Sequence, residues 1–153
     1  MLYYINHVVV KKRFHIMVLE ETVKNVGFIK YMGAFSVNKN SREILTSLDY
    51  AAQLLADPGN LVLIFPQGKL YSNFTGEIVF EKGLNRIMQK AGNSFQTIFA
   101  ATFIENLQHK KPVATVYLEQ GKQIDGATLL TDVRKAYQLH YNSSKLVQTE
   151  IVI

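Results

Sequence analysis

The residues best placed to do chemistry follow an apolar run near the middle of the chain. Leu61–Phe65 contains no polar residue, which predicts a central strand buried on both faces, and leads directly into Pro66–Lys69, which carries an amide and an amine. Pro66 fixes one backbone dihedral and Gly68 permits another that bulkier residues avoid, so the chain can turn sharply here. α/β folds bind ligands at the ends of their strands, but Pro-x-Gly is also an ordinary tight turn. Both interpretations stay open on these residues alone.

A second cluster combines basic residues with a predicted helix start. Lys39 and Arg42 lie beside Asn40, which forms a capping-box pattern with Glu43 three residues later. The free N–H groups and the dipole at a helix start favour binding of an anion, and phosphate is the expected ligand. The alternative is a solvated basic loop with an ordinary helix cap.

Alternating strands and helices must position these two clusters. Apolar runs bounded by turn residues predict strands, and apolar stripes at helical spacing predict helices. The expected strands are 14–19, a segment within 33–37, 61–65, 96–102 and 113–118; the expected helices are about 20–32, 44–55, 84–91 and 131–141, before a strand-like tail at 145–153. This order predicts an α/β fold, a mixed and largely buried sheet flanked by helices on both faces, in a single domain over residues 1–153.

Composition narrows the chemistry. The chain has no cysteine and four scattered histidines, which excludes a thiol nucleophile and a disulfide framework and gives no metal-binding motif. The net charge of +5 predicts an anionic partner: nucleic acid, an anionic membrane surface or a phosphorylated substrate. Tryptophan is absent and no basic run alternates with aromatic residues, so nucleic acid ranks last and we expect no nucleic-acid partner. The apolar runs are too short to cross a bilayer, so membrane contact is expected to be peripheral.

Three segments, in this order, resemble the lysophospholipid and glycerol-3-phosphate acyltransferase family (1-acylglycerol-3-phosphate acyltransferase-like). Residues 33–39, Gly-Ala-Phe-Ser-Val-Asn-Lys, resemble its second block, with Lys39 in place of the Arg that holds the substrate phosphate. Residues 65–68, Phe-Pro-Gln-Gly, resemble the Phe-Pro-Glu-Gly of its third block, with Gln67 in place of the Glu. Residues 80–84 are similar to the Phe-Lys-x-Gly stretch that follows, and Ala100 stands where the family's fourth block has Pro.

The resemblance implies transfer of a fatty acyl chain from an acyl thioester to the hydroxyl of a lysophospholipid or related glycerolipid. The co-substrate would be acyl-CoA or acyl-carrier protein, and no metal or redox cofactor is implied. The expected location is cytoplasmic, peripheral to the inner face of a membrane. The residues expected to bind substrate are Gly33, Lys39, Arg42, Phe65, Pro66, Gln67, Gly68 and Lys69.

The family's first block, Asn-His followed by four residues and an Asp, supplies the general base. Asn6-His7 matches it in part, but Lys12 occupies the Asp position, and a cation cannot hold an imidazole in its basic tautomer. We therefore expect no catalytic residue here, the true block upstream of Met1, and a truncated, inactive chain. A non-catalytic lipid- or phosphate-binding pseudoenzyme is the alternative. The other histidines are expected in the core (His15) or on the surface (His109 and His140).

Overall fold

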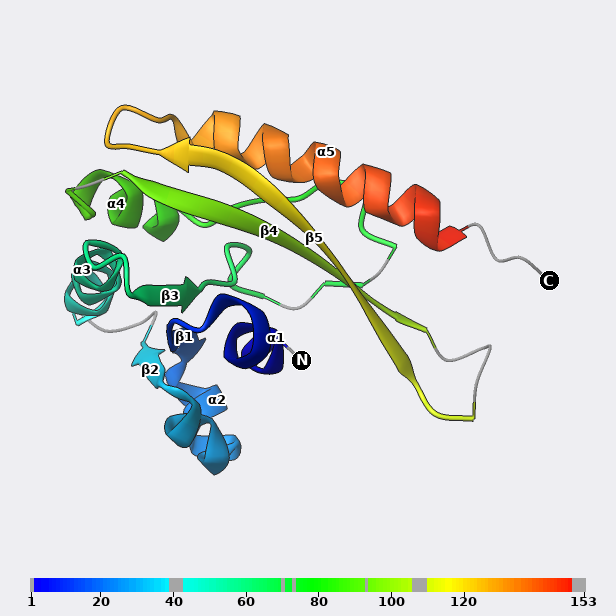
Figure 1. Ribbon diagram of the computed structural model, residues 1–153, viewed down its shortest axis with the longest axis horizontal. Coiled ribbons are helices and arrows are strands. Elements are labelled where there is room, and N and C mark those ends of the chain that lie inside the picture. Colours follow the sequence, from blue (N-terminus) through cyan, green and yellow to red (C-terminus); the bar gives the residue numbers. More distant parts are fainter. Residues whose placement is uncertain are drawn as a thin grey trace.

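The computed structural model is an α/β structure with a parallel and an antiparallel sheet, and helices pack against both (Figure 1). It describes residues 2–38, 43–69, 71–72, 74–92, 94–105 and 110–149. The predicted α/β class is confirmed. The two kinds of strand pairing are segregated: β2, β1 and β3 form a parallel sheet in that order, and β4 and β5 form an antiparallel pair.

The parallel sheet is built around β1 (Arg13–Leu19), which pairs with β2 (Ala34–Val37) on one side and β3 (Asn60–Leu63) on the other. The sequence favoured the apolar run 61–65 as a central strand buried on both faces. This was wrong: among the described strands β1 holds the centre, and the side chains of β3 are only half-buried. β3 also ends at Leu63, because Pro66 has no N–H for a ladder and restricts the residue before it.

Two helical segments connect β1 to β2, where the sequence predicted one helix. They are α2 (Glu20–Asn25) and the 3₁₀ helix η2 (Gly27–Met32). Gly27 interrupts the α-helical pattern, because glycine has a high entropic cost in a helix interior. The chain before β1 is helical as well: α1 (Leu2–Ile5) continues as the π-helical η1 (Asn6–Val10).

α3 (Ile44–Leu55) connects β2 to β3 and packs against α4 (Gly83–Lys90). The predicted apolar stripe of α3 is confirmed at Leu48, Ala51 and Ala52, which are buried, but not at Leu45, which is 50% exposed. They form one core cluster with Ile87 of α4. The Asn40 cap predicted for α3 lies outside the described residues.

A long twisted ribbon, β4 (Phe95–Glu105) and β5 (Val113–Ile124), forms the second sheet, and α5 (Leu130–Thr149) runs along it (Figure 1). β5 continues to Ile124, beyond the predicted end at residue 118. Position 121 within it requires glycine, because the side chain of Thr97 lies where a Cβ would be.

α5 also corrects the predicted end of the chain. The sequence ended this helix near Tyr141 and expected a strand from Lys145, but residues up to Thr149 are helical; residues 150–153 lie outside the described part. Ser143 Oγ donates to Leu139 O at 3.0 Å and Ser144 Oγ to His140 O at 2.8 Å. These hydrogen bonds to the preceding turn accommodate both serines within the helix.

Candidate functional site

The segment after β3 forms the tight turn predicted from Pro66 and Gly68. The Gly68 N–H donates to Phe65 O at 3.0 Å, and Gly68 has φ of 60°, a left-handed conformation that glycine adopts without strain. A second hydrogen bond connects the turn to a later segment of the chain: the Glu81 N–H donates to Pro66 O at 2.8 Å. The two segments that resemble neighbouring family blocks, 65–68 and 80–84, are therefore joined directly through their backbones.

Gln67 carries an unusual feature within this turn. Its Nε2 is buried, and no group among the described residues accepts a hydrogen bond from it. Buried amide donors nearly always have a partner, because an unmade bond costs about 1–3 kcal/mol. Neighbouring Pro66 and Gly68 are half-buried, whereas Phe65 and Lys69 are exposed. The turn therefore combines one buried, unpaired donor with an exposed cation at its end.

Gly33 lies at the end of η2 with φ of 79° and immediately precedes β2. It sits against β1: a Cβ at this position would overlap the carbonyl oxygen of Phe14, and the Ile16 N–H donates to Gly33 O at 3.2 Å. The glycine that resembles the start of the second block thus permits close packing between η2 and β1. Its expected contact with substrate remains a prediction.

The predicted basic cluster begins where β2 ends. Lys39 and Arg42 lie outside the described residues. Asn38, which follows β2 directly, donates from Nδ2 to Glu20 Oε2 at 2.8 Å. Glu20 also pairs with Lys24 at 2.8 Å, and this hydrogen bond and its charge lower the pKa of Glu20 below its ordinary 4.5.

The two candidate segments follow β2 and β3, whose carboxyl ends lie on the same side of the parallel sheet. β1, β2 and β3 run in one direction, so their carboxyl ends point the same way. Val37 ends β2 opposite Leu19, and Leu63 ends β3 opposite Ile16. In open α/β folds, ligands usually bind at the carboxyl ends of the parallel strands. The turn at 65–69 and Asn38, the residue directly after β2, both follow strands that end here.

The histidines do not form the family's catalytic pair within the described residues. His7 is exposed on η1 and His15 is half-buried in β1, and among the described residues neither has a carboxylate partner. Asn6 is buried next to His7 and binds the backbone of Lys12, donating to its O at 2.7 Å and accepting from its N at 3.2 Å. Asn6 therefore closes a local turn. His109 lies outside the described residues.

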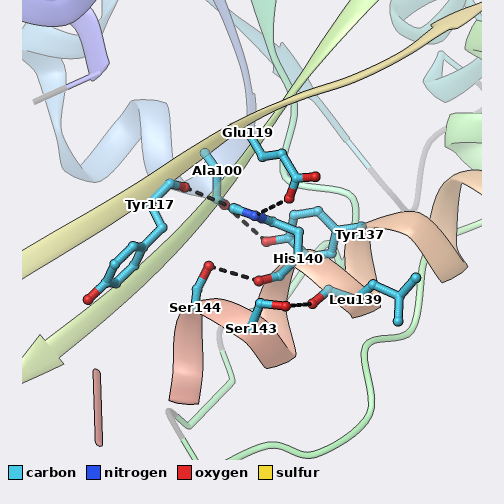
Figure 2. Close-up of polar contacts among 8 residues, drawn as sticks. All are labelled: Ala100, Tyr117, Glu119, Tyr137, Leu139, His140, Ser143 and Ser144. Carbon is cyan, nitrogen blue, oxygen red and sulfur yellow. Dashed lines mark hydrogen bonds and ion pairs between the residues drawn. The ribbon is translucent and has the colours of Figure 1, made fainter. Parts of the chain in front are cut away.

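His140 corrects the sequence interpretation, which expected a surface position. Its side chain is 6% exposed under the β4–β5 ribbon, with Nδ1 2.8 Å from Glu119 Oε2 and Nε2 3.1 Å from Tyr117 O (Figure 2). Both ring nitrogens therefore face oxygen atoms of β5, one of a side chain and one of the backbone. His140 thus ties α5 to β5, and neither nitrogen faces open space where a hydroxyl substrate could reach it.

Aromatic side chains surround this pair. Phe99 and Tyr137 have ring centroids 6.3 and 6.2 Å from that of His140. The Tyr137 hydroxyl donates to Ala100 O at 3.0 Å (Figure 2). Burial raises the pKa of Tyr137 above its ordinary 10.0. No sequence pattern predicted the contact between His140 and Glu119, because the two residues lie on different elements.

The described residues contain no group of three or more His, Cys, Asp or Glu side chains arranged to hold a metal ion. Within the same residues, no helix has both the length and the apolar character needed to span a bilayer.

Comparison with protein-family models identifies the family. Comparison with curated proteins and with solved structures found no match. A family model described as Acyltransferase matches residues 1–104, more than half of the chain, which include β1 to β3, the turn at 65–69 and nearly all of β4. His140 and Glu119 lie outside this match. The chain therefore belongs to the acyltransferase family.

Proposed function

We propose that this domain takes part in transfer of a fatty acyl chain from an acyl thioester to the hydroxyl of a lysophospholipid or related glycerolipid. The hydroxyl oxygen attacks the thioester carbonyl; the new C–O bond replaces the C–S bond, and the hydroxyl proton passes through a general base to the thiolate that leaves. Acyl-CoA or acyl-carrier protein would be the donor, and the chemistry requires no metal or redox cofactor. The reaction would take place at the cytoplasmic face of a membrane, without nucleic acid.

The observation that carries this proposal is the unpaired Nε2 of Gln67. Gln67 stands where the resembling family block has the Glu that binds the glycerol portion of the acceptor. A buried donor without a protein partner gains a full hydrogen bond when a ligand oxygen reaches it. In the proposed complex, Gln67 donates to an acceptor hydroxyl, and the rigid turn held by Pro66 and Gly68 fixes its position.

The acceptor phosphate would be bound by cations at the same sheet edge. Lys69 is exposed at the end of the turn, and Lys39 and Arg42 follow the end of β2. Charge-assisted hydrogen bonds to phosphate are roughly twice as strong as neutral ones. Gly33 permits the start of β2 to lie close to β1, so that these two strands end on the same side of the sheet.

We further propose that residues 1–153 alone bind the acceptor without turnover. In the family the general base is a His oriented by an Asp, and positioned bases typically contribute about 10²–10⁴-fold to rate. His7 and His15 lack a carboxylate partner among the described residues, and both nitrogens of His140 face other groups. A purely binding, non-catalytic domain is the second candidate, and it is favoured by the same observation.

The test combines binding with an activity assay. Short-chain 1-hexanoyl-glycerol 3-phosphate is titrated calorimetrically into the chain, into Gln67→Leu and into the control Gln120→Leu, which changes an exposed glutamine on β5. Gln67→Leu should weaken binding about five- to tenfold, the value of one neutral hydrogen bond, and Gln120→Leu should not. Equal affinity of all three proteins would contradict the proposed acceptor site.

The activity assay uses labelled acyl-CoA with the same acceptor. Binding without product supports the proposal for this chain. Product above a heat-denatured control would support acyl transfer but would contradict the assignment of no base within residues 1–153. Turnover by the complete gene product would then separate an acyltransferase from a non-catalytic binding domain.

A further inference from the structure

An open pocket lies between the start of α4 and the start of α5. It has a volume of about 450 Å³ and is lined by Lys82, Asn85, Leu129, Leu130 and Thr131. Pockets that bind small organic ligands usually have volumes of about 300–1,000 Å³, so this one is large enough for such a ligand. The residues that form it come from two elements far apart in the sequence.

The chemistry of the wall fits a ligand with an apolar part and a negative group. The exposed surface of the wall is predominantly apolar, and the wall includes Leu130 and Leu129, of which Leu129 is 62% exposed. Lys82 is the one charged side chain among the described lining residues, and it is a cation. α5 begins at Leu130, so the positive end of its dipole also lies at this wall.

The pocket is linked to the proposed acceptor site through the backbone. Lys82 directly follows Glu81, whose N–H donates to Pro66 O at 2.8 Å. Gly83, the first residue of α4, packs so closely on Leu48 of α3 that a Cβ would lie 3.2 Å from its side chain. The residues on either side of Lys82 therefore contact the turn at 65–69 and α3, which fixes the position of Lys82 in the pocket wall.

We propose that this pocket binds the alkyl chain of a single-chain anionic amphiphile, with Lys82 beside its negative group. The role of such a ligand rests on the proposed function: an acyltransferase that acts on lysolipids handles an alkyl chain close to a phosphate or carboxylate. Two sources share this chemistry, a lysophospholipid with its phosphate and a free fatty acid with its carboxylate. Binding in the pocket does not require Gln67.

The chain offers a matched control for the apolar wall. Leu139 is on α5 like Leu130, is 69% exposed, and does not line the pocket. Leu129→Asp and Leu139→Asp therefore make the same chemical change at similar exposure, inside and outside the pocket. Lys82→Met and Lys111→Met form the corresponding pair for the cation, because Lys111 is an exposed lysine elsewhere on the chain.

The experiment is a calorimetric titration with dodecyl phosphate below its micelle concentration. Leu129→Asp should weaken binding at least about tenfold, because a charged group replaces the apolar contact. Lys82→Met should weaken it about threefold or more and reduce its salt dependence. Leu139→Asp and Lys111→Met should stay within about twofold of the parent chain. Equal losses in both members of either pair, or no binding by the parent chain, would overturn the proposal.

Further ligands identify the chemistry that is bound. Inorganic phosphate and dodecanol should each bind with lower affinity than dodecyl phosphate. If either one binds with the same affinity, the proposal that the pocket recognises both the alkyl chain and the negative group is overturned. A lauroyl lysophosphatidate that binds more tightly than laurate assigns the site to a lysolipid, and the reverse order assigns it to a fatty acid. A result in which Gln67→Leu leaves all affinities unchanged while Leu129→Asp weakens dodecyl phosphate binding would refute the proposed acceptor site and support the proposed pocket. Urea unfolding of each variant verifies that it is folded.

Discussion

Gly33 and Phe14 are packed so tightly that any side chain at residue 33 would overlap the Phe14 carbonyl oxygen. This contact joins the end of η2 to β1, and Gly33 adopts φ of 79° to make it. The glycine that resembles the start of a family block therefore has a structural role of its own. It holds β2 against the central strand β1.

Gly33→Ala should destabilise the fold strongly. The methyl group meets backbone, which cannot move aside cheaply, and the positive φ adds strain, so we expect a loss of about 2–4 kcal/mol in the free energy of unfolding. Urea denaturation followed by circular dichroism measures it. Gly27→Ala is the control, because no atom lies within 4 Å of its Cβ position. It should be neutral or slightly stabilising, and a similar loss in both variants would refute the steric explanation.

Lys39→Ala should weaken acceptor binding more than Lys122→Ala. Lys39 is proposed to contact the acceptor phosphate, whereas Lys122 is an exposed lysine on β5, far in the sequence from the proposed site. One lost charge-assisted hydrogen bond corresponds to about 1.5–3 kcal/mol, or roughly ten- to 150-fold in affinity. Titration with 1-hexanoyl-glycerol 3-phosphate compares the two variants. Similar losses would mean that net charge alone accounts for binding.

His140→Ala should cost more stability than Glu119→Ala, although the two residues form one pair. His140 is 6% exposed and packs among aromatic rings, so its removal leaves a cavity and should cost about 2 kcal/mol or more. The Glu119 side chain is 58% exposed and regains water when its partner is lost, which limits its contribution to about 1 kcal/mol. Urea denaturation separates them, with Leu139→Ala as an exposed control on the same helix. Equal losses would indicate that the ion pair dominates.

The sequence predicted the local elements well and the long-range pairings less well. Helix 44–55 and strand 14–19 follow from apolar spacing and turn residues, and both are observed within about one residue. The turn at 65–69 was also predictable, because Pro66 and Gly68 restrict the backbone wherever they occur. Such features depend on neighbours in sequence, and their physics acts within one or two turns of the chain.

The errors have a common physical origin. The position of β1 at the sheet centre, the burial of His140 and the helical continuation at Lys145 are set by what packs against each segment. A single sequence contains the residues of these contacts but not their pairing. The unpaired Nε2 of Gln67 belongs to the same class, because only the surroundings decide whether an amide finds a partner. The residues of the candidate site could be named from sequence, but the feature that favours a ligand there could not.

Acid should weaken the contact between α3 and α4 through Asp49. Arg86 donates to both of its carboxylate oxygens, from Nε at 2.7 Å and from Nη2 at 2.8 Å, and Lys90 lies 3.9 Å away. The hydrogen bonds from Arg86 are the main cause that lowers the pKa of Asp49 below its ordinary 3.8. The folded state therefore binds fewer protons than the unfolded state. This stabilisation is complete well above pH 3.8 and disappears as the pH falls through the lower, folded-state pKa.

Urea midpoints measured at a series of pH values test this dependence. The parent chain should lose stability below about pH 4, and Asp49→Asn should start lower at neutral pH and fall less steeply, because its amide does not titrate. Arg86→Met should flatten the same part of the curve by returning the pKa of Asp49 toward 3.8. Parallel curves for the parent chain and both variants would assign the acid sensitivity to other carboxylates, such as Asp57, whose pKa is lowered mainly by the Gly59 N–H and also by Arg13.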